Sequence, residues 1–400
     1  MKLLVLSPVF PDAPSDGDRL RLYHWLQHLG TRHQITLACL ADPARAKDWR
    51  VSGLGTGLKA VERVPWSRFD KAVAAGARLA GPLPVNVNVA ASSAFRRLVD
   101  GLIARERYDA VFAYRLKMAP HALRFKGPRF LDYTDSLTRY TERRAMQAAL
   151  EGRHIAHRYS RWQARKLAGY EAWVAGQFDG LFVNAATDAL ALQAMAPRFA
   201  GRIHVAANGV DPHLLSSKPG GAKGSAKLVF VGHMAYASNV EAVLWFAQKV
   251  LPRIIAVRPD ATFEVVGGDA PPSILSLAGR PGVRLHGYQP DTLPYLAAAA
   301  LSVCPVLTGA GRQNKLMEAF AYGLPAVATK LAAQGAEAED GKHLLAADTA
   351  EGFAQAVCAL LQEPALGRRL AKEAARLVKS KYDWARNASQ LESVIVSQSR

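Results

Sequence analysis

Short apolar runs alternate with longer segments of helical spacing along most of the chain. A run such as Lys227–Val231 suits a strand that is buried on both faces, whereas Arg19–Leu29 carries its apolar residues at helical spacing. Because a strand followed by a helix leads the chain to a parallel neighbour, this alternation predicts an α/β fold with parallel sheets. The strand candidates are Leu3–Ser7, Gln34–Leu40, Lys59–Val64, Ala110–Tyr114, Arg129–Asp132, Leu181–Asn184, Ile203–Ala206, Lys227–Val231, Thr262–Val266, Val283–His286, Leu301–Pro305 and Ala326–Ala328.

The length of 400 residues favours two domains over one. A segment rich in Gly, Ser and Pro, Pro212–Ala226, reads as a linker. We therefore predict a Rossmann-like domain at 1–206, a linker at 207–226 and a second Rossmann-like domain at 227–381. The last stretch, 382–400, is helical in pattern and is expected to pack back on the first domain.

The charge is strongly positive and unevenly spread. The net charge is +18, and residues 1–206 hold 31 Lys/Arg against 17 Asp/Glu, which leaves +14 in the first half. A basic half indicates an acidic partner, and nucleic acid, an anionic membrane surface and a phosphorylated substrate all fit. Within this half, Arg139–Trp173 holds eight Lys/Arg with interleaved aromatic residues. That helix either rests on anionic lipid or is a solvated surface helix with its aromatic residues in the core.

The remaining composition constrains compartment and chemistry. The three cysteines, Cys39, Cys304 and Cys358, match no metal or CxxC spacing, which is typical of a reducing compartment. The apolar start of the chain is too short for a signal-peptide core, and no stretch approaches the ~20 apolar residues of a membrane span. We therefore expect a cytoplasmic protein that touches a membrane at most peripherally. The histidines show no metal spacing and no catalytic triad can be placed.

The loop Pro11–Arg19 follows the first strand and runs into a helix. Free N–H groups at a helix start favour an anion, so Gly17 would allow close approach of a diphosphate and Arg19 would add a charge. An ordinary turn with a capped helix is the alternative. The pair Asp16 and Asp18 is interpreted as helix capping, not as a metal site.

Two aspartates, Asp132 and Asp135, follow a strand in the middle of the first domain. Carboxylates at the carboxyl ends of parallel strands lie near the ligand crevice, where they would orient an acceptor. Capping of the following helix by Asp135 or Ser136 explains the same pattern equally well.

The segment Pro305–Gly323 is the strongest local feature. Gly309 and Gly311 lie in a loop directly before a helix predicted at Asn314–Tyr322, and Arg312 and Lys315 flank its start. N–H groups, the helix dipole and two cations thereby meet at one point, which suits a diphosphate leaving group. Glu318, one turn on, would accept hydrogen bonds from ribose hydroxyls or form a surface ion pair with Lys315.

These residues together resemble a known family. The ordered series is Gly17/Arg19, Asn208–Asp211, the segment FVGH ending at His233, Gly267-Gly268, His286-Gly287-Tyr288, Gly309–Lys315 and Glu318–Pro325. The series is similar to the retaining GT-B glycosyltransferases of family 4, and most similar to bacterial sugar transferases of exopolysaccharide and exosortase (PEP-CTERM) systems. The resemblance implies two Rossmann-like domains that face each other across a cleft, and transfer of a sugar from a nucleotide-sugar donor to a glycan or polyprenyl-linked acceptor, without a metal or other cofactor.

The resemblance also implies roles for individual residues. Catalytic roles fall to Arg312, Lys315, Asp132 and Asp135, and donor binding falls to Gly17, Arg19, Gly232, Gly287, Tyr288, Gly309, Gly311, Asn314 and Glu318. One departure stands out, because the glutamate that many members carry eight positions before Glu318 is Ala310 here. Backbone amides around Gly311 would then contact the sugar.

Other functions stay open at this point. A nucleotide-sugar epimerase or a phosphorylase would share the two-domain architecture. A basic nucleic-acid-binding protein is suggested only by the pI of about 10.0, and no known nucleic-acid-binding motif accompanies it.

Overall fold

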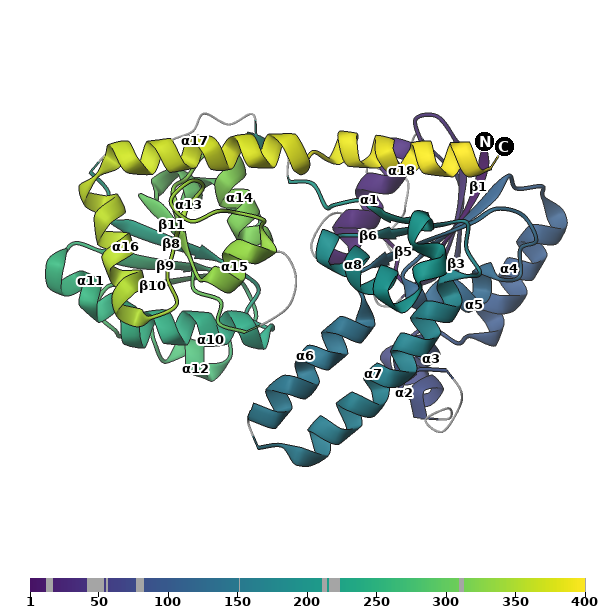
Figure 1. Ribbon diagram of the computed structural model, residues 1–400, viewed down its shortest axis with the longest axis horizontal. Helices are drawn as coiled ribbons and strands as arrows, with labels where there is room; N and C mark the ends of the chain where they lie inside the picture. Colours follow the sequence, from purple (N-terminus) through teal and green to yellow (C-terminus); the bar gives the residue numbers. More distant parts are fainter. Residues whose placement is uncertain are drawn as a thin grey trace. The chain divides into compact units, whose positions relative to one another are not determined.

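The computed structural model describes residues 1–11, 17–41, 54, 57–76, 83–150, 152–210, 214–215, 224–308 and 313–399. The chain divides into two compact units (Figure 1). Unit 1 comprises Met1–Asn208 together with Trp384–Arg400, and unit 2 comprises Gly209–Asp383. Within the predicted linker at 207–226, only residues 207–210, 214–215 and 224–226 are described.

Unit 1 is built on a seven-stranded parallel sheet in the order β3-β2-β1-β4-β5-β6-β7. Alternate residues of the central strand point to opposite faces, so Leu4 and Leu6 enter one apolar core while Leu3 and Val5 enter the other. Burial on both faces explains the continuous apolar runs seen in the sequence. The strands are β1 Lys2–Ser7, β2 Gln34–Ala41, β3 Leu58–Pro65, β4 Ala110–Tyr114, β5 Arg129–Thr134, β6 Gly180–Val183 and β7 Ile203–Val205.

The helices of unit 1 cover both faces of this sheet. One pair, α6 and α7, forms a hairpin that extends away from the sheet (Figure 1). The helices are α1 Gly17–Leu29, α2 Arg68–Gly76, α3 Val85–Asn88, α4 Ser93–Arg105, η3 Leu116–Met118, α5 Ala119–Ala122, α6 Leu137–Leu150, α7 His154–Ala175, α8 Ala186–Met195, η4 Pro197–Arg202 and α18 Trp384–Gln398.

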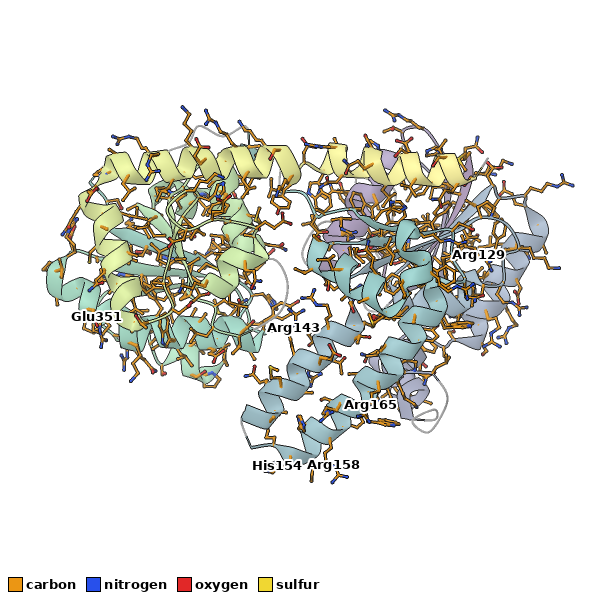
Figure 2. The ribbon with its side chains drawn as sticks, in the orientation of Figure 1. Arg129, Arg143, His154, Arg158, Arg165 and Glu351 are labelled. Atoms are coloured by element: carbon orange, nitrogen blue, oxygen red, sulfur yellow. The ribbon has the colours of Figure 1, made fainter. Side chains whose placement is uncertain are left out.

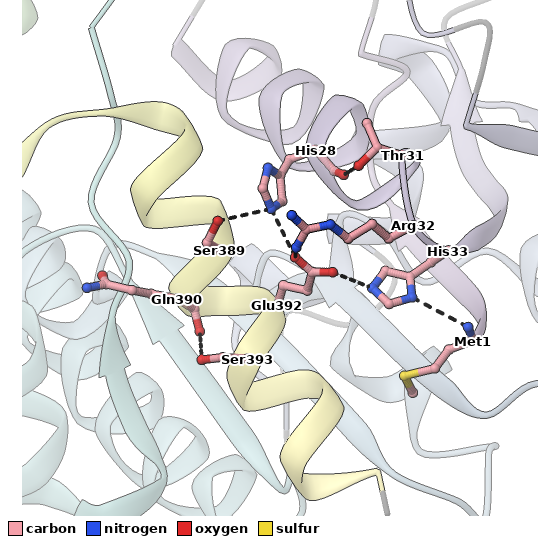
Figure 3. Close-up of polar contacts among 9 residues, drawn as sticks. All are labelled: Met1, His28, Thr31, Arg32, His33, Ser389, Gln390, Glu392 and Ser393. Carbon is pink, nitrogen blue, oxygen red and sulfur yellow. Dashed lines mark hydrogen bonds and ion pairs between the residues drawn. The ribbon is translucent and has the colours of Figure 1, made fainter.

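The C-terminal helix α18 packs on α1 within unit 1. The ring of Trp384 stacks on His24 with centroids 4.3 Å apart. Farther along, the buried carboxylate of Glu392 lies 3.0 Å from His28, 2.9 Å from Arg32 and 3.0 Å from His33 (Figure 3). Three basic groups of the α1 region thus converge on one carboxylate and hold the two ends of the chain together.

Unit 2 is built on a six-stranded parallel sheet in the order β10-β9-β8-β11-β12-β13. Its strands are β8 Lys227–Val231, β9 Thr262–Val266, β10 Val283–Gly287, β11 Leu301–Cys304, β12 Ala326–Ala328 and β13 Leu345–Ala346. Its helices are α10 Ala237–Trp245, η5 Phe246–Val250, α11 Leu251–Val257, α12 Pro272–Leu275, α13 Leu293–Ala298, α14 Asn314–Tyr322, α15 Lys330–Gly335, α16 Ala350–Gln362 and α17 Pro364–Lys381.

The predicted strands match the observed ones closely, and the differences have local causes. The strand β13 has two residues and leaves no periodic signal in the sequence. The single helix expected at 239–257 begins at Ala237 and contains a π-helical turn, Phe246–Val250, that ends two residues before Pro252. Because proline has no N–H, the helical hydrogen-bond ladder is interrupted there and a wider turn is accommodated.

Candidate functional site

Both sheets reverse their strand order once, between β1 and β4 in unit 1 and between β8 and β11 in unit 2. The loops that leave the carboxyl ends of two such strands diverge to opposite faces of the sheet. This divergence opens a crevice at the carboxyl edge, where open α/β sheets bind their ligands. The carboxyl edge of each sheet is therefore the candidate position for a site.

In unit 2, backbone hydrogen bonds join three consecutive loops at this edge. Gly232 N donates to Val266 O over 2.9 Å, Met234 N to Gly268 O over 2.9 Å, and Gly267 N to Gly287 O over 2.8 Å. Gly267 has a φ of 155°, and a Cβ at this position would lie 1.8 Å from Gly232 O. Only glycine fits this close approach. The loops after β8, β9 and β10 consequently form one continuous floor.

Three predicted donor-binding residues, Gly232, Gly287 and Tyr288, lie on this floor. Gly287 has a φ of 66°, in the left-handed region that favours glycine. The neighbouring Tyr288 leaves 71% of its surface exposed. An exposed aromatic ring beside a close-approach loop is suited to stack against a flat ligand group such as a nucleobase.

The helix α14 begins at Asn314, as predicted, on the far side of the strand reversal. Its N-cap residue Gln313 makes no side-chain capping hydrogen bond. Side-chain caps ordinarily satisfy the free N–H groups of a first turn, so this helix start retains its capacity to bind an anion. Asn314 is exposed there. The predicted residues Gly309, Gly311 and Arg312, as well as Ala310, lie outside the described part of the chain.

Lys315 in the first turn of α14 points back toward the sheet. Its Nζ donates to Gln313 Oε1 over 2.9 Å and lies 5.3 Å from the centroid of the Phe230 ring. Burial lowers the pKa of this amine, opposed by the nearby Cys304 and Glu318. An ammonium withdrawn from water has much to gain from a diphosphate that replaces the lost solvation. Glu318, one turn on, is half-buried.

A cavity of about 760 Å³ lies at the same edge of unit 2. Most of its lining is apolar, and two carboxylates, Glu241 and Asp269, interrupt it. Glu241 accepts a hydrogen bond from the Thr308 hydroxyl, directly before the glycine loop. Asp269 lies 2.8 Å from Nε2 of His233. The lining residues are Met234, Ala235, Ala237, Val240, Glu241, Leu244, Trp245, Asp269, Pro271, Ser273 and Leu307.

Glu241 was not among the residues predicted from the sequence. The signal was present, because Glu241 is the one charged residue of α10 (ASNVEAVLW). A single carboxylate on an otherwise apolar helix, after a strand that is followed by glycine, indicates the wall of a cavity. The spacing of residues in the sequence does not show that Glu241 contacts Thr308.

In unit 1, Asp132 occupies a different position from the one predicted. Its side chain is completely buried. Arg21 donates to it from Nε (2.8 Å) and Nη2 (3.1 Å), and Trp25 Nε1 adds a third hydrogen bond of 2.9 Å. The backbone N–H of Thr134 donates to it over 2.8 Å. A carboxylate with no exposed surface and four donors fixes α1 to the sheet, and the acceptor-binding role predicted for Asp132 is therefore replaced by a structural one.

Arg21 completes this buried network and was not predicted either. Its Nη1 donates to Ala206 O and to Asn208 Oδ1, both over 2.7 Å. One guanidinium thus ties α1 to β5 and to the last residues of unit 1 before the chain enters unit 2. Gly17 and Arg19 lie in the first turn of the same helix, where Arg19 is half-buried.

Asp135 remains accessible at the carboxyl edge of unit 1. It is exposed and follows Thr134, which has a φ of 68°. Arg115, at the carboxyl end of β4, has a φ of 71°. A β-branched residue with positive φ is strained, and such strain concentrates at ligand-binding edges. Asp135 therefore stays the candidate carboxylate on the acceptor side.

The start of α6 is closed by Glu171 of α7. Ser136 Oγ donates to its Oε2 over 3.0 Å, and Leu137 N donates to its Oε1 over 2.8 Å. Burial raises the pKa of this carboxyl to about 7. Ser136 also accepts a long hydrogen bond of 3.4 Å from Arg139 N. Ser136 thus provides a side-chain contact expected of a helix cap.

Among the described residues, no group of three or more His, Cys, Asp or Glu side chains is placed to hold a metal ion. No described helix combines the length and apolar character that crossing a bilayer requires.

Residues 225–363, all within unit 2, match a protein family described as glycosyl transferases group 1. No curated protein sequence matches the chain. Among solved structures, Anabaena HepE in complex with UDP has a TM-score of 0.67 at 16% identity, over 99% of this chain and 100% of that one. Sucrose-phosphate synthase from Thermosynechococcus elongatus has a TM-score of 0.70 at 15% identity, over 99% of both chains.

A third similar structure is the UDP-forming α,α-trehalose-phosphate synthase from Burkholderia xenovorans in complex with glucose-6-phosphate. Its TM-score is 0.65 at 13% identity, over 98% of this chain and 99% of that one. The predicted α/β fold with two Rossmann-like domains, the GT-B fold, is confirmed. The family match and the fold together support a glycosyltransferase.

Proposed function

We propose that the protein transfers a sugar, with retention, from a nucleotide-sugar donor to a glycan or polyprenyl-linked acceptor. The observation that carries the proposal is the start of α14, where Lys315 and an open helix N-terminus lie at the strand reversal of unit 2. Similar structures were solved with UDP and with UDP-glucose, which supports a donor of this class. Membership of family 4 and a place in exopolysaccharide synthesis belong to the same proposal and rest on the sequence resemblance.

The diphosphate of the donor binds at the start of α14. Lys315 and Arg312 supply positive charge, and N–H groups of Gly309, Gly311 and Asn314 complete the anion site. Glu318 holds the ribose. The floor formed by Gly232 and Gly287 carries the base, with Tyr288 stacked on it. The donor-binding roles of Gly17 and Arg19 rest on the sequence resemblance.

The transferred sugar occupies the cavity at the carboxyl edge of unit 2. Its apolar wall, which includes Met234 and Trp245, suits the C–H face of a pyranose. Glu241 and Asp269 accept hydrogen bonds from sugar hydroxyls. Many proteins of the family that the sequence resembles carry a glutamate at the position of Ala310. Glu241 then provides the carboxylate that Ala310 lacks.

The reaction breaks the bond between the anomeric carbon and the diphosphate oxygen while the acceptor hydroxyl bonds to the same face of that carbon. Positive charge develops on the sugar and negative charge on the departing diphosphate. Lys315, Arg312 and the helix N-terminus stabilise the departing charge. A phosphate oxygen takes the proton of the acceptor hydroxyl, and Asp135 orients the acceptor. We propose that no metal or other cofactor takes part.

The acceptor meets the protein on unit 1, at the inner face of the plasma membrane. The net charge of +14 on residues 1–206 favours a partner that carries phosphate groups, as a polyprenyl diphosphate or an anionic bilayer does. The protein on this proposal is cytoplasmic and touches the membrane only from its surface.

A thermal-shift screen against UDP-, GDP-, ADP- and dTDP-sugars tests donor binding, since a ligand that binds the folded chain raises its melting temperature. Product analysis with the best donor then separates transfer from epimerisation, which needs no acceptor, and from phosphorolysis, which consumes inorganic phosphate. No shift with any nucleotide sugar would overturn the proposal.

Lys315→Met tests the anion site, because methionine keeps the packing of the lysine stem on Phe230. We expect about 10²- to 10³-fold slower transfer. Lys330→Met removes an exposed lysine from the first turn of α15 and serves as the matched control. Equal turnover in the two variants would refute the assignment of Lys315.

A further inference from the structure

The helices α6 and α7 form a self-supporting hairpin. Small side chains are buried in it, Ala145 and Ala148 on α6 and Ala164 on α7. His157 Nδ1 donates to Ala145 O over 2.8 Å and links the two helices directly. Close packing of small residues and a cross-hairpin hydrogen bond give the hairpin its own stiffness.

The base of the hairpin is fixed to the body of unit 1. Glu171 of α7 accepts hydrogen bonds from Ser136 and Leu137 at the start of α6. Arg139 Nη1 lies 2.9 Å from Oδ1 of Asp188 on α8. The hairpin is therefore held at one end and extends from the sheet at the other (Figure 1).

The outward face of α7 carries an apolar stripe, defined as Ile155, Tyr159 and Trp162. These side chains are 87%, 47% and 43% exposed. Their spacing of four and then three residues places them on one side of the helix. Met146 on α6 is 69% exposed as well. A soluble helix ordinarily presents polar residues to water, so this stripe indicates a partner that is itself apolar.

A row of cations, the arginine row, runs beside the stripe. Arg158, Arg161 and Arg165 are all exposed, and Arg158 and Arg165 point away from the hairpin in Figure 2. Lys166 Nζ lies 4.4 Å from the centroid of the Trp162 ring, so cation and aromatic face meet directly. Over residues 137–166, the sequence holds eight Lys/Arg and two Glu.

We propose that the apolar stripe and the arginine row bind the surface of an anionic lipid bilayer. Aromatic and aliphatic side chains at this spacing enter the headgroup region, and the arginines contact lipid phosphates. This surface would bring the enzyme to a membrane-linked acceptor, and in that respect the inference rests on the proposed function.

Other occupants fit the hairpin less well. A soluble polyanion would neutralise the arginine row but leave Ile155 and Trp162 in water. A second copy of the chain would cover the stripe but bring two strongly positive hairpins together, which electrostatic repulsion opposes. A bilayer with anionic headgroups satisfies the apolar and the charged part at once.

Co-sedimentation of the full chain with vesicles tests the proposal. We expect binding to phosphatidylcholine vesicles that contain 30% phosphatidylglycerol and weak binding to pure phosphatidylcholine. The triple variant Arg158→Gln, Arg161→Gln, Arg165→Gln should bind about 100-fold more weakly, since each basic residue near an anionic surface contributes about a five-fold factor. The variant Ile155→Ser, Trp162→Ser should lose a comparable factor at unchanged charge.

Matched controls lie in unit 2. Arg368→Gln, Lys372→Gln, Lys379→Gln removes three exposed charges from α17, and Val257→Ser, Leu275→Ser removes two exposed apolar side chains. Both controls should bind vesicles like the wild type. Equal loss in the control and hairpin charge variants would mean that net charge alone attracts lipid and would overturn the proposal. So would wild-type binding that survives Ile155→Ser, Trp162→Ser.

Two further measurements separate the alternatives. A monomer–dimer equilibrium in sedimentation that disappears with Ile155→Ser, Trp162→Ser would assign the stripe to a second copy and overturn the bilayer. The hairpin variants should keep the thermal shift that the best nucleotide sugar gives. Vesicle binding without any nucleotide-sugar shift would leave the bilayer contact standing and refute the proposed function, whereas the reverse result would refute only the contact.

Discussion

The substitution Glu171→Gln should make unfolding of unit 1 less sensitive to pH. The carboxylate is fully buried between α7 and the start of α6, and burial raises its pKa from an ordinary 4.5 to about 7. Between these two values the folded chain holds a proton that the unfolded chain has released. The wild-type free energy of unfolding therefore contains a term that is present below pH 4.5 and is lost as the pH rises to about 7.

The size of this term follows from the two pKa values. A difference of one pKa unit corresponds to about 1.4 kcal/mol, so the Glu171 term amounts to about 3 kcal/mol. Glutamine has nearly the same shape, and its amide oxygen accepts the hydrogen bond from Leu137 N without any titration. The free energy of unfolding of wild type minus that of Glu171→Gln should fall by about 3 kcal/mol between pH 4.5 and pH 8.

Urea unfolding followed by tryptophan fluorescence measures the difference, because six of the seven tryptophans belong to unit 1. Glu142→Gln is the matched control, since Glu142 is exposed on the same hairpin and its difference curve should be flat. A flat curve for Glu171→Gln would show that burial does not perturb this carboxyl. A curve that rises with pH would show that the start of α6 stabilises the ionised form more than burial opposes it.

Two further predictions concern the sites in the two units. Asp132→Ala should lower the free energy of unfolding by about 3–5 kcal/mol because it leaves Arg21 buried without its carboxylate. Asp100→Ala, at the exposed pair with Arg124, should have a much smaller effect in the same urea experiment. Glu241→Gln should lower kcat/KM for sugar transfer by about 10- to 100-fold, the value of one charge-assisted hydrogen bond, and leave nucleotide binding intact. The exposed Glu351 (Figure 2) supplies its control, Glu351→Gln, and equal kinetics in both variants would remove Glu241 from the sugar site.

The positions of the strands were predictable because they depend on local pattern. Strands such as Ala110–Tyr114 and Lys227–Val231 are continuous apolar runs, and α14 starts where the sequence placed it, at Asn314. Glycines also carried information, since Gly267 and Gly287 are needed where loops approach closely or φ is positive. These features require only the chemistry of neighbouring residues, and one sequence is enough to read them.

The roles of the charged side chains depended on residues far away in the chain. Asp132 lies near the end of β5 and Asp135 directly follows that strand. Arg21, 111 positions earlier in the chain, binds Asp132, which is buried, whereas Asp135 is exposed. Glu241 lines the cavity of unit 2 and contacts Thr308, 67 positions later, only because α10 packs beside that loop.

The apolar stripe on α7 shows the same division. The sequence determined that this segment is helical, basic and aromatic, because periodicity and composition are local properties. Only the tertiary structure decided which face of the helix packs against α6, and so which aromatic residues enter the core and which remain in water. The burial of a side chain depends on contacts between segments that are distant in the sequence. Those contacts cannot be inferred from the residues next to it in the chain.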